Sequence, residues 1–209
     1  MSDLLANKKI SPIPAAERRK IAAVLRLFRE SDRCSRQLRS VTGLGCISGC
    51  GRCCEDPNVQ TTILEMLPLA AEYFAEHKER LLREGFAYDP MEDFCRFYRA
   101  DPAIKGNGRC SEYARRPLVC RLFGFSVRLN KHNQPDLITC GRIKETFPAD
   151  YQKTQAMLAQ GLPAPKMSDY SMRLLAIDPT LGAERIPINL AFHKALERIA
   201  FLHELSLKT

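Results

Sequence analysis

The amino-acid sequence predicts a single, mostly helical α+β domain with a small β-hairpin, short strands and loops that carry cysteines. Apolar residues recur at helical spacing over long stretches near both ends of the chain. Two short β-prone segments, 125–130 and 136–140, flank a turn-rich pentapeptide, which is the pattern of a hairpin. Hydrophobic residues make up 45% of the 209 residues and charged residues 27%, an ordinary globular mixture that can bury one core.

The first helix is expected to begin at Pro14, since proline is tolerated in the first helical turn. We expect residues 1–13 to form a flexible arm and residues 14–43 to form a basic helix. Its apolar face comprises Ile21, Val24, Leu25 and Phe28, with Leu38 and Val41 extending it. Most of its many arginines are interpreted as a solvated outer surface. Cys34 lies in this helix without other thiols nearby and is interpreted as a buried or idle cysteine.

A second helix is predicted to begin after Thr62, because Glu65 three residues later completes a capping box. Pro68 is expected to bend this helix early and Gly85 to end it. Its predicted core face consists of Ile63, Met66, Leu67, Leu69, Ala70, Tyr73 and Phe74.

Beyond residue 86 the periodicity weakens, and the glycine-rich segment 105–108 predicts a turn. Pro117 is expected to start a short helical turn carrying Leu118 to Leu122, ahead of the hairpin. Residues 141–160 are predicted to be helical, 161–165 to break the chain, and 188–205 to form a final helix.

Eight of the nine cysteines lie between residues 46 and 140: Cys46, Cys50, Cys53, Cys54, Cys95, Cys110, Cys120 and Cys140. This confinement indicates one site, or two neighbouring sites, built from separate segments. The N-terminus has no apolar signal segment and no stretch is long enough to span a membrane, so we expect a cytoplasmic protein whose thiols stay reduced. Clustered cysteines in that compartment favour metal ligation or catalysis over disulfides.

The local pattern around these cysteines fits metal ligation. The turn from Cys50 to Cys53 lets two sulfurs converge, whereas the adjacent Cys53 and Cys54 serve two centres, or one of them lies just outside a centre. Cys120 lies in the first turn of a predicted helix, where a thiolate is favoured. Eight soft donors without paired histidines indicate an iron–sulfur cluster or zinc.

Arginines accompany most of these thiols, as at Arg52 beside Cys53 and Arg142 near Cys140. A tetrathiolate around a divalent ion carries about −2 charge, so guanidinium groups would stabilise it. The alternatives are an anionic substrate beside the metal, or chance in an arginine-rich chain.

The spacing Cys46-x3-Cys50-x2-Cys53 also occurs in radical S-adenosylmethionine enzymes, where it holds three corners of a [4Fe–4S] cluster. Those enzymes are built on repeated βα units. The chain shows no such repeats after the motif, so we do not assign it to that superfamily.

CGRCC at 50–54, Cys95, GRCSEYARRPLVCRLFGF at 108–125 and Cys140 together resemble the YkgJ-type cysteine-cluster family (CxxCxxCC), described as a zinc- or iron-chelating domain. Tyr113, Arg116, Pro117, Cys120, Arg121 and Phe123 match the second block of that family, while the first gap is three residues instead of two. The resemblance covers roughly residues 46–140 and implies chelation by the eight cysteines. A related group includes flagellin lysine N-methylases, and this relation implies an iron–sulfur-dependent protein-modifying activity as one alternative.

We therefore divide the chain into the arm 1–13, the basic helix 14–43, a cysteine-cluster metal-binding domain at 44–145 and a helical extension at 146–209 packed on it. Arg52, Tyr113, Arg116 and Arg121 are expected to support the metal from outside its ligands or to contact an anion. The leading hypothesis is an iron–sulfur protein for electron transfer or a modification reaction, with a redox partner or an anionic ligand. The alternative is a zinc-stabilised interaction module whose net charge of +8 attracts an acidic partner or, less favoured, nucleic acid.

Overall fold

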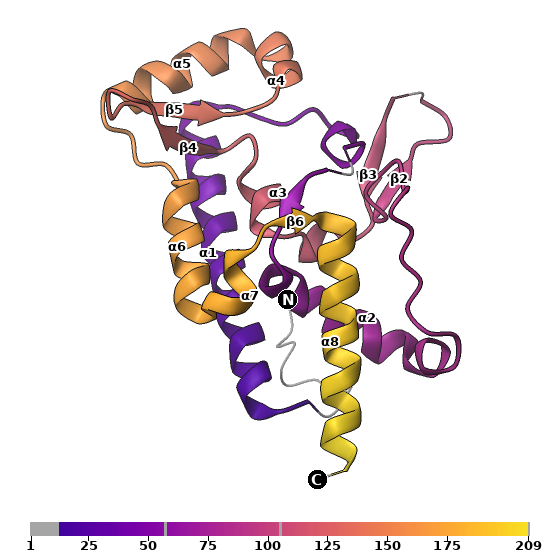
Figure 1. The fold of residues 1–209 in the computed structure, drawn as a ribbon. Coiled ribbons are helices and arrows are strands. Elements are labelled where there is room, and N and C mark those ends of the chain that lie inside the picture. Colours follow the sequence, from indigo (N-terminus) through magenta and orange to yellow (C-terminus); the bar gives the residue numbers. More distant parts are fainter. Residues whose placement is uncertain (1–12, 57, 105, 209) are drawn as a thin grey trace.

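The computed structural model describes residues 13–56, 58–104 and 106–208 as eight α-helices and three antiparallel pairs of short strands (Figure 1). The helices are α1 (Ala15–Thr42), α2 (Ile63–Glu84), α3 (Leu118–Leu122), α4 (Gly141–Thr146), α5 (Pro148–Ala159), α6 (Met167–Ile177), α7 (Pro179–Ala183) and α8 (Ile188–Leu207). The strands are β1 (Gln60–Thr61), β2 (Tyr98–Ala100), β3 (Gly108–Cys110), β4 (Ser126–Leu129), β5 (Pro135–Ile138) and β6 (Ile186–Pro187), paired as β1–β6, β2–β3 and β4–β5. The mostly helical α+β fold is thereby confirmed.

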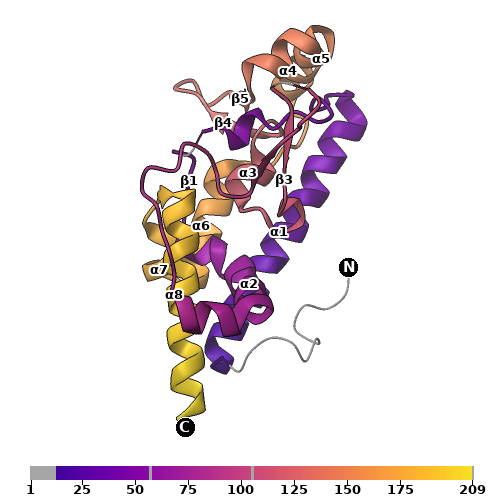
Figure 2. The ribbon, with the colours of Figure 1, turned by 90° about the vertical axis from the view of Figure 1, so that its right-hand side faces the viewer.

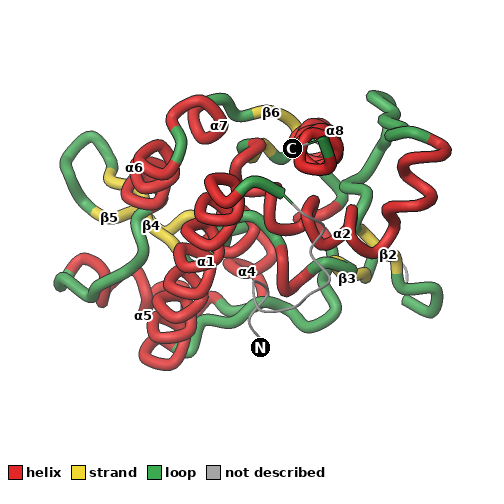
Figure 3. The backbone as a smooth tube through the Cα atoms, turned by 90° about the horizontal axis from the view of Figure 1, so that it is seen from below, coloured by secondary structure: helices red, strands yellow, loops and turns green. Residues whose placement is uncertain are grey.

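The main core lies where α1, α2 and α8 meet. Helix α2 contacts both α8 and α1. Figure 3 shows α8 end-on from below, with α2 lying across it. Fully buried side chains from all three helices fill the contact, among them Phe28 of α1, Phe74 of α2 and Phe192 of α8. Because α8 supplies part of this core, the region around the cysteines rests on the C-terminal segment of the chain.

A second, smaller core closes the other end of α1. Here the β4–β5 hairpin and helices α4 and α5 cover that end (Figure 2). Its buried residues are Leu38, Leu44, Val127, Leu137, Ile143 and Leu158. The two cores lie at different points along α1, and the cysteine loop follows directly after the end of that helix.

Several predicted features are confirmed. Thr62 and Glu65 form the capping box of α2, and Gly85 ends that helix. Helix α3 begins after Pro117, and β4 and β5 form the predicted hairpin with Ser126 opposite Ile138. The final helix extends to Leu207.

Other features differ from expectation. The break in helical backbone inside α2 lies at His77 (φ −121°, ψ 16°), and Pro68 lies within the described helix. Val41 is 45% exposed and does not extend the apolar face of α1. The predicted helix 141–160 is two helices, since Pro148 begins a new one directly after Phe147.

Elements that the sequence did not reveal are β1, β6, α6, α7 and the β2–β3 hairpin around the glycine-rich turn. Of the predicted arm, residues 1–12 lie outside the described residues, and Ile13 is buried in the main core. No helix in the described ranges is long and apolar enough to cross a membrane.

Candidate metal centre

The first cysteine segment is a loop built from two tight turns. Helix α1 ends at Gly43, which has a left-handed φ of 81°, and the chain then enters the segment that carries Cys46. The amide of Cys50 donates to the carbonyl of Ile47 at 3.2 Å, which closes the first turn. A short 3₁₀ turn, η1 (Arg52–Cys54), follows directly. Cys50, Cys53 and Cys54 therefore lie within two consecutive turns, and Cys46 directly precedes the first turn.

This loop is fixed to the β2–β3 hairpin by backbone hydrogen bonds. The Gly108 amide donates to the Gly49 carbonyl at 2.8 Å, and the Cys95 amide donates to the Cys54 carbonyl at 3.0 Å. Across the hairpin, Tyr98 pairs with Cys110. These contacts bring thiols from the first loop, from the segment before β2 and from β3 into one region.

Close approach, not backbone freedom, explains the glycine at position 51. Its φ of −95° is open to any residue. A Cβ there would lie 2.4 Å from Cε2 of Tyr98 and 2.8 Å from the carbonyl carbon of Gly108. A Cβ added to Gly108 would lie 2.3 Å from the same ring. The tyrosine ring is therefore packed against two glycines, and its hydroxyl donates to Glu55 at 3.2 Å.

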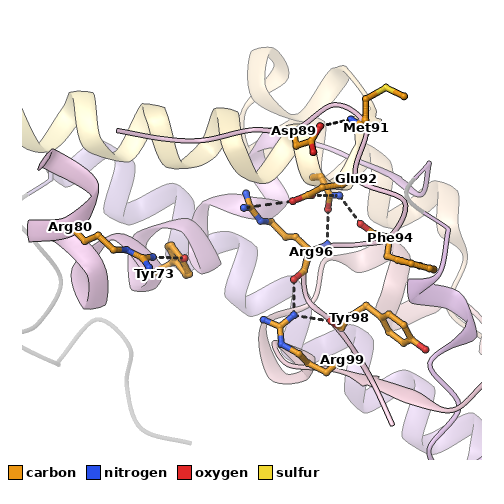
Figure 4. A network of polar contacts seen from close by, with 10 residues as sticks. Tyr73, Arg80, Asp89, Met91, Glu92, Phe94, Arg96, Tyr98 and Arg99 are labelled. Carbon is orange, nitrogen blue, oxygen red and sulfur yellow. Dashed lines mark hydrogen bonds and ion pairs between the residues drawn. The ribbon is translucent and has the colours of Figure 1, made fainter. Parts of the chain in front are cut away.

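The segment that carries Cys95 is anchored to α8 by a residue that sequence reasoning missed. The Asn189 side chain accepts a hydrogen bond from the Arg96 amide at 3.0 Å and donates to the Phe94 carbonyl at 2.9 Å. It also donates to Glu92 at 2.7 Å, within the polar network around residues 89–99 drawn in Figure 4. The only sequence signal was an amide in the otherwise apolar first turn of α8.

Cys120 is positioned by the short helix α3. The amide of Leu118 donates to the buried carboxylate of Glu65 at 2.9 Å, and the same carboxylate caps α2 by accepting from the Thr62 amide at 3.1 Å. One buried acidic group thus satisfies free amides at the starts of two helices. Its position fixes Cys120 relative to the start of α2.

The four residues expected to support the metal have different surroundings. Arg121 is buried, pairs with Asp32 of α1 and donates to the carbonyls of Ala114 and Arg116, so its guanidinium braces α3 against α1. Arg116 lies over the exposed Tyr113 ring, 3.7 Å from its centroid. Arg52 is exposed and pairs with Glu55 at 2.6 Å.

Cys140 immediately precedes α4, and this places Arg142 beside the first loop. Nη1 of Arg142 lies 3.0 Å from Sγ of Cys50 and donates a hydrogen bond to it. The two residues are 92 positions apart in the chain. This contact places a cationic side chain of α4 directly against a sulfur of the first loop.

Hydrogen bonds between thiols set the charge at the centre of the cluster. Cys54 is bonded to Cys110 and to Cys53, and as the donor its own pKa is raised. The Cys54 bond lowers the pKa of Cys53 to about 6 and also lowers the pKa of Cys110, and the charge of Arg116 acts in the same direction. Two of these sulfurs are therefore held toward the thiolate form that metals bind.

Burial has the opposite effect on other cysteines. It raises the pKa of Cys95 to about 11. It also raises the pKa of Cys120, with negative charge on Cys53, Cys95 and Cys110 adding to the effect. The expectation that the start of α3 favours a Cys120 thiolate is therefore not met, because burial dominates. For Cys46, desolvation and then the charges of Cys50, Cys53 and Cys140 raise the pKa.

These mutual effects show which thiols are neighbours, and Cys34 is in contact with Tyr170 instead. Among the described residues, no three or more His, Cys, Asp and Glu side chains are already gathered as a metal-binding group. The donor chemistry nevertheless fits zinc or iron, because eight soft thiols from five segments lie in one region beside Arg116 and Arg142.

Comparison with known proteins supports metal binding in general. No curated protein and no solved structure matches the chain. Residues 45–147 match the family model described as "CxxCxxCC: Putative zinc- or iron-chelating domain". The matched segment contains every cysteine of the cluster and excludes Cys34 and Asn189. Through residues 45–147, the chain belongs to the CxxCxxCC family of zinc- or iron-chelating domains.

Proposed function

We propose that the protein chelates metal through the eight clustered cysteines, with an iron–sulfur cluster as the preferred occupant and zinc as the alternative. One observation carries the proposal: contacts between distant segments bring their thiols to one region, with the Cys95 amide bonded to the Cys54 carbonyl at 3.0 Å and Arg142, near Cys140, bonded to Sγ of Cys50 at 3.0 Å. The Cys95 amide donates to the Cys54 carbonyl, so the backbone itself holds these two cysteine segments together. Such a contact favours a shared role for the thiols over a chance grouping.

The chain's own residues prepare this site for a cationic occupant. The contact with Cys54 holds Cys53 toward its thiolate form, and the Arg142 guanidinium places a positive charge 3.0 Å from Sγ of Cys50. Tyr98 and Asn189 fix the segments on which the other thiols lie. An iron–sulfur cluster would supply one-electron redox chemistry here, whereas zinc would cross-link the segments.

Iron is preferred for two reasons. Cys46, Cys50 and Cys53 have a spacing known to hold three corners of a [4Fe–4S] cluster. Cys140 offers a fourth thiol, since Arg142, two residues after it, contacts Sγ of Cys50 at 3.0 Å. Cys46 and Cys53 are also exposed, which would give an electron donor access to the centre.

The test is elemental analysis together with a visible spectrum on protein purified without oxygen. Iron with matching acid-labile sulfide and a colour that bleaches on reduction would support the iron–sulfur assignment. Zinc without colour would support the structural alternative, and absence of both metals would refute chelation. Cys50→Ser and Cys120→Ser should each reduce bound metal, while the matched control Cys34→Ser should retain it, because Cys34 contacts Tyr170 outside the cluster.

A second candidate function, binding of a polyanion, is favoured by one face of α1. The exposed arginines of α1 include five that share one face of the helix over about 25 Å: Arg19, Arg26, Arg29, Arg33 and Arg36. The acidic residues of this helix are engaged by other elements, in the pairs Glu17–Arg198, Glu30–Arg173 and Asp32–Arg121. The arginine face therefore keeps its positive charge.

Fluorescence anisotropy with a labelled duplex would test this second function. Nucleic-acid binding predicts an affinity that falls steeply with salt, and a double reversal at Arg26 and Arg33 to glutamate should abolish it. The same reversal at Arg128 and Lys131, on the β4–β5 hairpin, is the control. An affinity that is independent of salt, or equal in both variants, would exclude the arginine face as the binding surface.

A further inference from the structure

We propose that Arg142 is a positioning residue of the metal site: its guanidinium holds the sulfur of Cys50 in place and supplies positive charge that metal-bound thiolates require. This inference rests on the proposed chelating function and assigns a role within it to one side chain. The observation that carries it is a direct contact, since Nη1 of Arg142 donates to Sγ of Cys50 at 3.0 Å. The contact joins two segments that lie 92 positions apart in the chain.

Both ends of this contact rest on the smaller core. Ile143, the neighbour of Arg142, is buried in that core. Leu44, which lies two residues before Cys46, is buried in the same core, and its amide donates to Oγ1 of Thr42 at 3.2 Å. The start of α4 and the stem of the cysteine loop are therefore held by the same group of apolar side chains. The fold itself thus places the arginine beside the loop.

The charge of Arg142 lacks a carboxylate partner. Its side chain is half-buried, and no carboxylate of the described ranges lies at ion-pair distance from it. Other arginines near the cysteines differ, since Arg52 pairs with Glu55 and Arg121 pairs with Asp32. A half-buried cation is costly unless an anionic group accompanies it. A tetrathiolate site around a divalent ion carries about −2 charge and would provide that group.

The contact gives Arg142 two effects on metal binding. The N–H···S hydrogen bond restrains the Cys50 side chain, so less conformational freedom is lost when this sulfur becomes a ligand. The positive charge offsets the negative charge of the thiolates, which would strengthen metal binding and favour the more reduced state of an iron–sulfur cluster. Neither effect requires the arginine to bind the metal itself.

Competition for Zn²⁺ between the reduced full chain and a chromophoric chelator tests the inference. Arg142→Met keeps most of the apolar stem but removes the charge and the donors. It should lower the affinity for Zn²⁺ by about 10–100-fold, the loss typical of groups that orient metal ligands. Arg142→Lys keeps the charge and should recover part of the affinity. Arg109→Met is the matched control, because Arg109 precedes Cys110 but has an exposed side chain, and it should bind Zn²⁺ as the wild-type chain does.

Two further measurements separate positioning from a general loss of stability. If Arg142 acts through the Cys50 sulfur, adding Arg142→Met to Cys50→Ser should cause a much smaller loss of affinity than adding it to the wild-type chain. In protein that holds iron, Arg142→Met should lower the midpoint potential by about 59 mV, which is a tenfold effect for one electron. Circular dichroism checks the folding of each variant, and Arg142→Gln replaces Arg142→Met if the latter does not fold.

The outcomes distinguish a failure of this inference from a failure of the proposed function. Equal Zn²⁺ affinity in the wild-type chain and Arg142→Met, or an equal loss in Arg109→Met, would overturn the role of Arg142 while leaving chelation intact. Additive losses in the double variant would do the same, because the arginine would then act by a route other than Cys50. Binding of neither zinc nor iron by the wild-type chain would instead refute the proposed function itself.

Discussion

Replacing Gly51 with alanine tests whether the contact between the cysteine loop and the β2–β3 hairpin builds the site. The added Cβ would lie 2.4 Å from the Tyr98 ring and 2.8 Å from the backbone of Gly108. The ring is hydrogen-bonded to Glu55 and the second contact is backbone, so neither neighbour can move freely. Overpacking of this kind costs about 1–3 kcal/mol. For a chain of this size, 2 kcal/mol would lower Tm by about 4–8 °C.

The clash should also separate the first loop from β3, because the Gly49–Gly108 hydrogen bond lies beside it. We therefore expect Gly51→Ala to lower both Tm, measured by circular dichroism, and the amount of bound metal. Gly45→Ala is a matched control in the same loop, since a Cβ there meets nothing within 4 Å. If Gly51→Ala kept the Tm and metal content of Gly45→Ala, the loop would not depend on this contact and our account of the site would fail.

Three further predictions concern the surroundings of the cluster. Asn189→Ala removes three hydrogen bonds and should lower the free energy of unfolding in urea by about 1–3 kcal/mol. Amide hydrogen exchange should become faster around Cys95, and unchanged exchange there would exclude the anchoring role. Arg121→Leu breaks a largely buried ion pair and should cost about 3–5 kcal/mol, and a loss below 1 kcal/mol would show that the pair is dispensable. In the metal-free protein, alkylation of Cys53 should rise with pH through about 6, because its folded pKa is depressed. The stability that this pKa difference contributes is present above the unfolded pKa of the thiol and is lost as pH falls through 6. Cys54→Ala removes the hydrogen bond that lowers the pKa of Cys53, so the alkylation midpoint of Cys53 should return toward about 8.5.

Signals that act over a few residues were sufficient to predict much of the fold. The capping box at Thr62 and Glu65 fixed the start of α2, and Gly85 fixed its end. Pro117 likewise marked the start of α3. Such signals can be read from sequence because a cap and its partner lie within one helical turn.

The β2–β3 hairpin shows where this approach failed. Its strands have three residues each, too short for an alternating pattern, and they are held by the tyrosine ring between Gly51 and Gly108. Neither glycine needs a special backbone conformation, so composition alone could not show why it is there. The break at His77 is another local feature without a sequence signal that we could identify.

The sequence by itself determined what the site is made of: eight thiols confined to one part of the chain, flanked by arginines, in a helical scaffold. Only the tertiary structure decided which thiols are neighbours, which arginine meets a sulfur, and that a residue outside the matched family segment holds the Cys95 loop. Arg142 and Cys50 are 92 positions apart, and Asn189 and Arg96 are 93 apart. Contacts across such separations depend on how helices pack against one another, and that packing is set by the summed burial of many apolar side chains and not by any local motif.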